Sequence, residues 1–166
     1  MHADSIHFPD SLKYQTKKLA RTVYGGGGIM PDFFVPIDTT QYTDYHRNIV
    51  AKGVVIKTTM KFIESHRKEL QSKYKKFETF NDKFEISDEI LANMQTLAEQ
   101  EKIKFDEKQY RKSLPLIKTQ LKALIARDLW DMNEYFQIMN TTDSSVLQAL
   151  KVLNEGAYEK VVMKKW

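Results

Sequence analysis

The chain changes character near residue 38, and this change constrains its fold more than any other feature. Three of its four prolines and a run of four glycines, residues 25–28, lie within the first 38 residues. Beyond them, apolar residues recur at steps of three and four, and glycine occurs only at Gly53 and Gly156. Turn-forming residues favour short strands, whereas apolar residues at helical spacing favour amphipathic helices. The sequence therefore predicts a β-containing segment over residues 1–38 and an all-helical domain over residues 39–166.

In the first region, two short runs of β-branched or aromatic residues flank the glycines. These runs, Thr22–Tyr24 and Phe33–Val35, predict a strand, a glycine turn and a second strand. A phosphate-binding glycine loop would need a helix directly after it. A strand pattern follows instead, and no Gly-Lys-Ser or Gly-Lys-Thr is present. A sheet turn is therefore favoured over a nucleotide site.

In the second region, capping residues and apolar stripes predict about five helices. The first is capped by Asp38 or Thr39 and ends at Gly53, and the second runs from Val55 to Tyr74. The third is capped by Ser87, and the fourth runs from Asp106 to about Asn140. The fifth is capped by Asp143 or Ser144 and stops near Gly156. Residues 77–84 fit either a short helical turn or a packed loop. Pro115 either kinks the fourth helix or lies in the first turn of a fresh helix capped by Ser113. The predicted fold class is mostly α, a bundle of about five helices preceded by a short β-hairpin.

Apolar stripes on these helices form the predicted core, with Trp130 among its members. The stripes on the third and last helices are Ile90, Leu91, Met94, Leu97 and Ala98, and Val146, Leu147, Leu150 and Leu153.

Composition narrows the chemistry open to the chain. The absence of cysteine excludes disulfides, thiolate zinc sites and cysteine nucleophiles. The net charge of +4 arises from 21 Lys and 5 Arg that are interspersed with acidic residues. Dispersed lysine is typical of a solvated surface, so nucleic acid is not an expected partner. No apolar run approaches the ~20 residues needed to span a bilayer, and the N-terminus lacks the layout of a signal peptide.

Two Ser-x-x-Lys pairs are the only nucleophile motif. Ser65 with Lys68 and Ser72 with Lys75 have the helical spacing that lets a lysine activate a serine. Both lysines lie in a lysine-rich, solvated stretch, where the desolvation that lowers a lysine pKa is not expected. These pairs are therefore predicted not to be catalytic.

The remaining polar residues also predict no site. The four histidines, His2, His7, His46 and His66, show no metal-binding spacing. Asp128 and Asp131, one helical turn apart and next to Arg127, are expected to form surface ion pairs. No catalytic, cofactor-binding or metal-ligating residue is predicted, and no cofactor.

One stretch resembles a known enzyme family. Asp10–Tyr14, then Arg-Thr-Val-Tyr-Gly-Gly-Gly-Gly-Ile-Met-Pro-Asp over residues 21–32, and then Phe34–Pro36 closely resemble part of the C-terminal processing (tail-specific) serine peptidases, above all their long Bacteroidetes-type members. The helical remainder resembles the C-terminal extension of those proteins, notably over residues 118–130. The resemblance thus covers nearly the whole chain. It departs from the family pattern at Ala20, where glycine is frequent, and at Pro115.

The resemblance implies that this chain is the C-terminal portion of such a peptidase, with residues 1–38 as the last strands of the protease domain. Family members use a serine nucleophile with a lysine base, and a PDZ domain that binds the carboxylate of the substrate's C-terminus. The segments that contain that serine and lysine are absent from these 166 residues, so the chain by itself is expected to be inactive. The implied role of residues 39–166 is bracing, assembly or substrate gating.

The same resemblance implies partners and a location. The expected partners are the protease and PDZ domains of the parent chain, its protein substrates, and a second copy as a homo-oligomer. The implied location is periplasmic or otherwise extracytoplasmic. A lone two-stranded hairpin is marginal in water, so residues 1–38 are expected to dock on the chain's own helices or to pair with another copy.

Two interpretations from other classes stay open. The first is a free-standing helical module for protein–protein interaction, without any protease. The second is a self-contained Ser-Lys hydrolase that uses Ser65 or Ser72.

Overall fold

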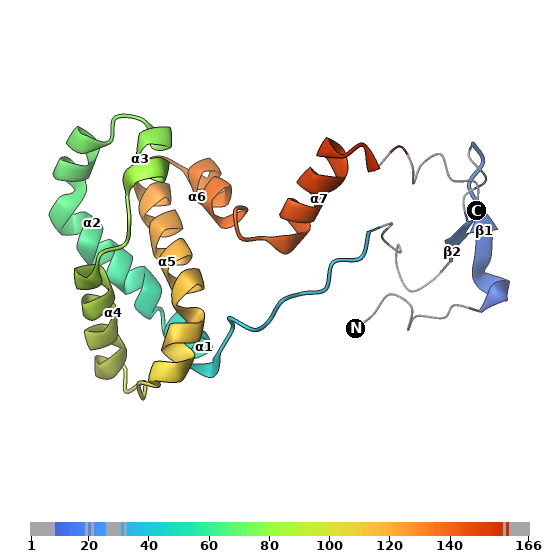
Figure 1. The fold of residues 1–166 in the computed structure, drawn as a ribbon. Helices are drawn as coiled ribbons and strands as arrows, with labels where there is room; N and C mark the ends of the chain where they lie inside the picture. The colour runs from blue at the N-terminus through green and yellow to red at the C-terminus, as the bar shows by residue number, and fades with distance from the viewer. Residues whose placement is uncertain are drawn as a thin grey trace. The chain divides into compact units, whose positions relative to one another are not determined.

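A computed structural model of the chain, which describes residues 9–18, 20, 22–25, 31, 33–157 and 159, is mostly helical (Figure 1). The chain divides into two compact units, residues 38–143 and residues 1–37 with 144–166. The larger unit is called the helical body below. The predicted fold class, mostly α with a short hairpin before the helices, is confirmed.

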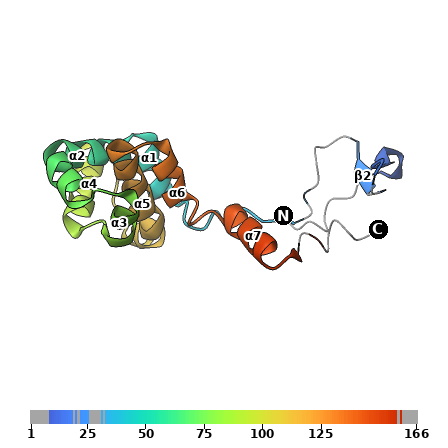
Figure 2. The same cartoon turned by 90° about the horizontal axis from the view of Figure 1, so that it is seen from above.

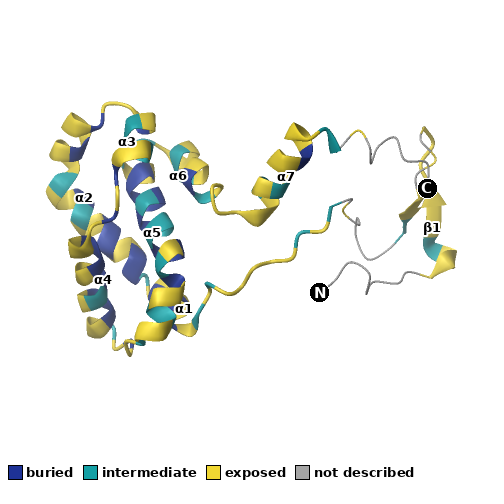
Figure 3. Ribbon diagram, in the orientation of Figure 1, coloured by how far each residue is buried: buried dark blue, intermediate teal, exposed yellow. Residues whose placement is uncertain are grey.

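The helical body is built from six helices. They are α1 (Asp44–Ala51), α2 (Val54–Lys73), α3 (Phe77–Lys83), α4 (Asp88–Gln100), α5 (Glu107–Leu129) and α6 (Met132–Met139). Helix α2 packs against both α4 and α5, and both views of the ribbon show these three helices side by side (Figures 1 and 2). Their buried faces are turned inward (Figure 3). The largest fully buried side chains at this centre include Ile49, Ile63, Phe80, Met94, Ile117, Leu121 and Ile125.

Several helix boundaries agree with the capping residues expected from the sequence. The Ser87 side chain accepts a hydrogen bond from the Ile90 N–H and begins α4. Asp106 accepts one from the Gln109 N–H and begins α5. All five residues of the predicted α4 stripe are buried.

The predicted start of the first helix, at Asp38 or Thr39, is wrong. The Asp38 carboxylate accepts from the Thr40 N–H, which fixes a local turn instead of a helix. Thr43 caps α1, since its hydroxyl accepts from the His46 N–H. Gly53 separates α1 from α2 in a left-handed conformation with φ of 70°, which glycine adopts without a steric penalty.

The predicted long helix from Asp106 to about Asn140 is two helices. Helix α5 runs through Pro115 without interruption and ends at Leu129. Asp131 then begins α6 as its cap. Between them, the ring of Trp130 packs on Phe77 and Phe80, with ring centroids 5.9 and 5.3 Å apart. Residues 77–83, left open by the sequence, form helix α3 because their aromatic rings complete this cluster.

Helix α7 (Ser144–Asn154) belongs to the smaller unit. Its predicted core stripe is wrong, because Leu147, Leu150 and Leu153 are about half exposed or more, and Val152 is the residue it buries. The chain then turns at Gly156, where φ is 63°, as expected.

The hairpin pairs different segments from those expected. Strand β1 (Lys13–Gln15) pairs antiparallel with β2 (Thr22–Tyr24), and Tyr14 lies opposite Val23. The predicted strand over residues 33–35 is wrong, since these residues belong to no strand. Of the expected glycine turn over residues 25–28, residues 26–28 lie outside the described residues.

The connection between the two strands contains Ala20 in a left-handed conformation, with φ of 51°. Its N–H donates to the Thr16 carbonyl at 3.0 Å. A turn therefore forms at Ala20, although alanine is strained in this region of φ.

Candidate functional site

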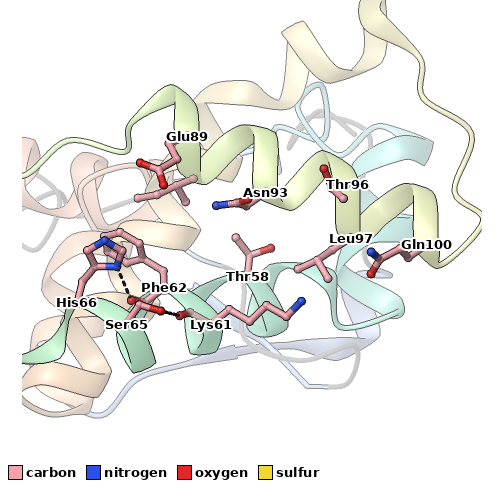
Figure 4. A pocket seen from close by; sticks show the side chains of 11 residues that line it. Thr58, Lys61, Phe62, Ser65, His66, Glu89, Asn93, Thr96, Leu97 and Gln100 are labelled. Atoms are coloured by element: carbon pink, nitrogen blue, oxygen red, sulfur yellow. Dashed lines mark hydrogen bonds between the residues drawn. The ribbon is translucent and has the colours of Figure 1, made fainter.

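The helical body has a groove of about 240 Å³ between α2 and α4 (Figure 4). It is called the α2–α4 groove below. Most of its lining residues are polar, and three are apolar. The lining residues are Thr58, Lys61, Phe62, Ser65 and His66 from α2, and Glu89, Ile90, Asn93, Thr96, Leu97 and Gln100 from α4. The lining therefore offers many hydrogen-bonding groups and a smaller apolar part, Phe62, Ile90 and Leu97.

His66 is the most constrained polar side chain in the groove. Its ring stacks on that of Phe62, with centroids 4.5 Å apart, and its Nδ1 lies 3.0 Å from the Phe62 carbonyl oxygen. Because a carbonyl oxygen only accepts, Nδ1 bears the hydrogen, and in the neutral imidazole Nε2 keeps a lone pair. The groove thus contains a hydrogen-bond acceptor that is held in a fixed orientation.

The two Ser-x-x-Lys pairs do not form hydrogen-bonded dyads. The Ser65 hydroxyl donates to the Lys61 carbonyl at 3.3 Å and not to Lys68. Ser72 and Lys75 are exposed near the end of α2, and no hydrogen bond joins them in the described part of the chain. This geometry shows no activated serine at either position.

The described histidines lie apart from each other and from any acidic cluster. His46 on α1 is 3% exposed, and its Nε2–H donates to Gln120 Oε1 at 2.9 Å, which leaves Nδ1 buried without a partner. Across the described ranges, no three His, Asp or Glu side chains are grouped closely enough to hold a metal ion. His2 and His7 lie outside the described residues.

The acidic pair near the end of α5 has partners other than the one expected. Asp128 forms its ion pair with Arg67 of α2, not with Arg127. Asp131 caps α6, where it accepts from the Met132 N–H at 2.6 Å. The two carboxylates therefore serve to join α2 to α5 and to begin α6. Trp130 packs against the core, as predicted.

A buried polar cluster fastens the chain before α1 to the middle of α5. Ser113 is fully buried, and its hydroxyl donates to the Gln41 carbonyl at 2.6 Å. The Thr43 hydroxyl lies 2.7 Å from Ser113 Oγ. One turn away, the Tyr45 N–H donates to Gln109 Oε1 at 2.8 Å. We call this cluster the Ser113 lock.

Sequence reasoning treated Ser113 only as a cap for a broken helix. Its position four residues before Ile117, itself four before Leu121, places it on the buried stripe of α5. That spacing is the signal that identifies it as an inward-facing residue.

Lys122 is a second polar residue that the sequence did not single out. Its ammonium group donates to the Asn81 carbonyl at 2.6 Å and so joins α5 to α3. Partial burial lowers the pKa of Lys122, and the nearby carboxylates of Glu85 and Asp82 oppose that change.

Comparison with known proteins places the chain in a family. A family model described as "Family of unknown function (DUF8443)" matches residues 45–131, more than half of the chain, and the chain belongs to this family. The matched range begins within α1 and ends at the cap of α6. No curated protein and no solved structure matches the chain. No helix in the described part of the chain combines the length and the apolarity needed to cross a membrane.

Proposed function

We propose that this member of the DUF8443 family is the non-catalytic C-terminal region of a tail-specific serine endopeptidase that acts outside the cytoplasm. The observation that carries the proposal is the Arg-Thr-Val-Tyr-Gly-Gly-Gly-Gly-Ile-Met-Pro-Asp pattern at residues 21–32. In this proposal the nucleophilic serine and its lysine lie upstream in the parent chain, and the helical body braces the protease domain.

The exposure of the hairpin supports the assignment of residues 1–38 to a larger sheet. Every residue of β1 is exposed, and so are Thr22 and Val23 of β2. The Tyr14 side chain, 59% exposed, and Val23, 43% exposed, face one another across the pair. Two three-residue strands with uncovered apolar side chains are marginal in water. Further strands, such as those of a protease domain, would bury them.

The Ser113 lock supports a bracing role for the helical body. The chain enters α1 through residues 33–43, which have no regular secondary structure. Gln41 and Thr43 at the end of this connection are bonded to the centre of the longest helix. These bonds therefore hold the last residues of the connection against α5.

The helical body also has its own core, so it requires no protease domain to supply its packing. A separately packed domain suits a structural role. Assembly with a second copy and gating of substrate entry are the other roles that such a domain would serve.

The experiment has two steps. The coding sequence upstream of Met1 is read first, and an in-frame PDZ and peptidase region is expected there. A start codon at Met1 with no such region would overturn the proposal and favour a free-standing helical interaction module.

In the second step, residues 39–166 are deleted from the full-length enzyme. We expect lower thermal stability of the protease domain and slower cleavage of an unfolded protein substrate. Unchanged folding, assembly and cleavage would refute the bracing role. A serine-reactive probe is expected to leave the 166-residue chain unlabelled, and labelling at Ser65 or Ser72 would instead indicate a self-contained hydrolase.

A further inference from the structure

The α2–α4 groove contains two charged side chains of opposite sign that have no ion-pair partner. Glu89 and Lys61 both line it, and neither forms an ion pair within the described residues. Some other carboxylates of the helical body, such as Glu101 and Asp128, are paired with lysine or arginine, whereas Glu64 and Glu69 form no ion pair within the described residues. The groove therefore presents an unmatched carboxylate and an unmatched ammonium group to a ligand.

These two charges lie towards opposite ends of the groove. Glu89 and His66 lie at one end, and the Lys61 side chain extends away from His66 towards Leu97 and Gln100 (Figure 4). Lys61 and His66 are five residues apart on α2, which separates their backbones by about 7.5 Å along the helix. A lysine side chain that points back towards the helix N-terminus increases this separation, so the ends lie roughly 10 Å apart or more.

The end with Glu89 and His66 accepts hydrogen bonds. Glu89 supplies carboxylate oxygens, and His66 Nε2 supplies a lone pair because Nδ1–H is committed to the Phe62 carbonyl. An ammonium group has three donors and a positive charge, so it matches both acceptors. At the other end, the Lys61 ammonium matches a carboxylate.

Two exposed hydroxyl groups that line the groove can accept hydrogen bonds. The hydroxyls of Ser65 and Thr96 already donate to the carbonyls of Lys61 and Ala92. Their remaining lone pairs can accept only from a donor such as a peptide N–H. The Asn93 side chain, which also lines the groove, has both a donor and an acceptor to offer.

We propose that the α2–α4 groove binds a short peptide of about three residues with both termini free. Its ammonium group would lie at Glu89 and His66, and its carboxylate at Lys61. An extended peptide spans about 3.3–3.6 Å per residue, so three residues cover roughly 10 Å. A volume of about 240 Å³ suits a ligand of this size. The groove would bind such a peptide whether or not the chain belongs to a peptidase.

The test uses trialanine and the full chain labelled with ¹⁵N. Trialanine is expected to cause saturable shifts of the backbone amides along α2 and α4, centred on the residues that line the groove. Acetylation of its N-terminus or amidation of its C-terminus removes one charged partner. Each modification is expected to weaken binding about five-fold, as for the loss of one partly exposed ion pair.

Two variants assign the ends of the ligand. Glu89→Gln is expected to weaken binding of trialanine and to leave the affinity for acetyl-trialanine unchanged. Lys61→Met is expected to weaken binding of trialanine and to leave the affinity for the amidated peptide unchanged. Lys68→Met is the matched control, because Lys68 is an exposed lysine of α2 that does not line the groove. All three sites are exposed, so the fold is expected to be retained.

Absence of saturable shifts at 10 mM trialanine would overturn the proposal. Equal affinity for the free and capped peptides would also overturn it, as would equal effects of Lys61→Met and Lys68→Met.

Discussion

Replacement of Ser113 by alanine tests whether the Ser113 lock holds the connection to the helical body. The hydroxyl takes part in two hydrogen bonds, to the Gln41 carbonyl at 2.6 Å and with the Thr43 hydroxyl at 2.7 Å. Each bond of this kind contributes about 1 kcal/mol net. Their loss should therefore lower the free energy of unfolding by about 2 kcal/mol, since Ser113 is fully buried and water cannot replace its hydroxyl.

Alanine has a higher helix propensity than serine, so the same substitution also raises the free energy of unfolding by about 0.5 kcal/mol. Ser72→Ala is the control for that gain, because Ser72 is exposed on α2. Urea unfolding followed by circular dichroism at 222 nm would measure both variants. We expect Ser113→Ala to be less stable than Ser72→Ala by about 2 kcal/mol. A difference below about 0.5 kcal/mol would refute the argument that this cluster fastens the connection.

Three further variants have expected effects of defined sign. Tyr45→Phe should leave neutral-pH stability unchanged or slightly raised, because the buried hydroxyl has no partner. Burial raises the pKa of Tyr45 to about 12, so the free energy of unfolding of the unmodified chain should fall as pH rises from 10 to 12. The fall should be smaller in Tyr45→Phe, and urea unfolding at each pH would measure both. Pro115→Ala should raise the melting temperature, since it restores an N–H inside α5; an unchanged or lower value would contradict this. Ala20→Gly should slow hydrogen exchange of the β1–β2 amides by relieving a strain of about 1 kcal/mol, and faster exchange would argue against strain at φ 51°.

The parts of the fold that follow from local patterns were predictable from the sequence. Ser87 and Asp106 have side chains that satisfy free N–H groups at the next turn, so the starts of α4 and α5 could be located. The spacing of Ile90, Met94 and Leu97 could only be helical, and all three are buried.

The errors lie where tertiary contacts decide. The ring of Trp130 packs on Phe77 and Phe80, about 50 residues earlier in the sequence. Helix α5 ends at these contacts, although the apolar pattern of the sequence continues beyond them. The partner of Thr22–Tyr24 is Lys13–Gln15, which has little β-propensity in two of its three residues. Pairing of that kind depends on register and on the turn at Ala20, not on composition.

The candidate groove was the least predictable feature. Its lining comes from two helices that the sequence places about 30 residues apart, and most of its residues are ordinary polar side chains. His66 was expected at the edge of an apolar stripe, and it does stack on Phe62. The lone pair on His66 Nε2 depends on the hydrogen bond from Nδ1–H to a backbone carbonyl. The sequence contains no pattern that predicts this hydrogen bond.

The most direct test of the proposed function is the composition of the native protein that contains the helical body. An antibody against residues 38–143 would isolate it from its source cells, and mass spectrometry would identify its tryptic peptides and intact mass. We expect a protein well above 19.5 kDa whose peptides include an upstream peptidase region with a serine nucleophile and a lysine base. A native protein of 19.5 kDa with no upstream peptides would contradict the proposal that this chain is part of a tail-specific peptidase.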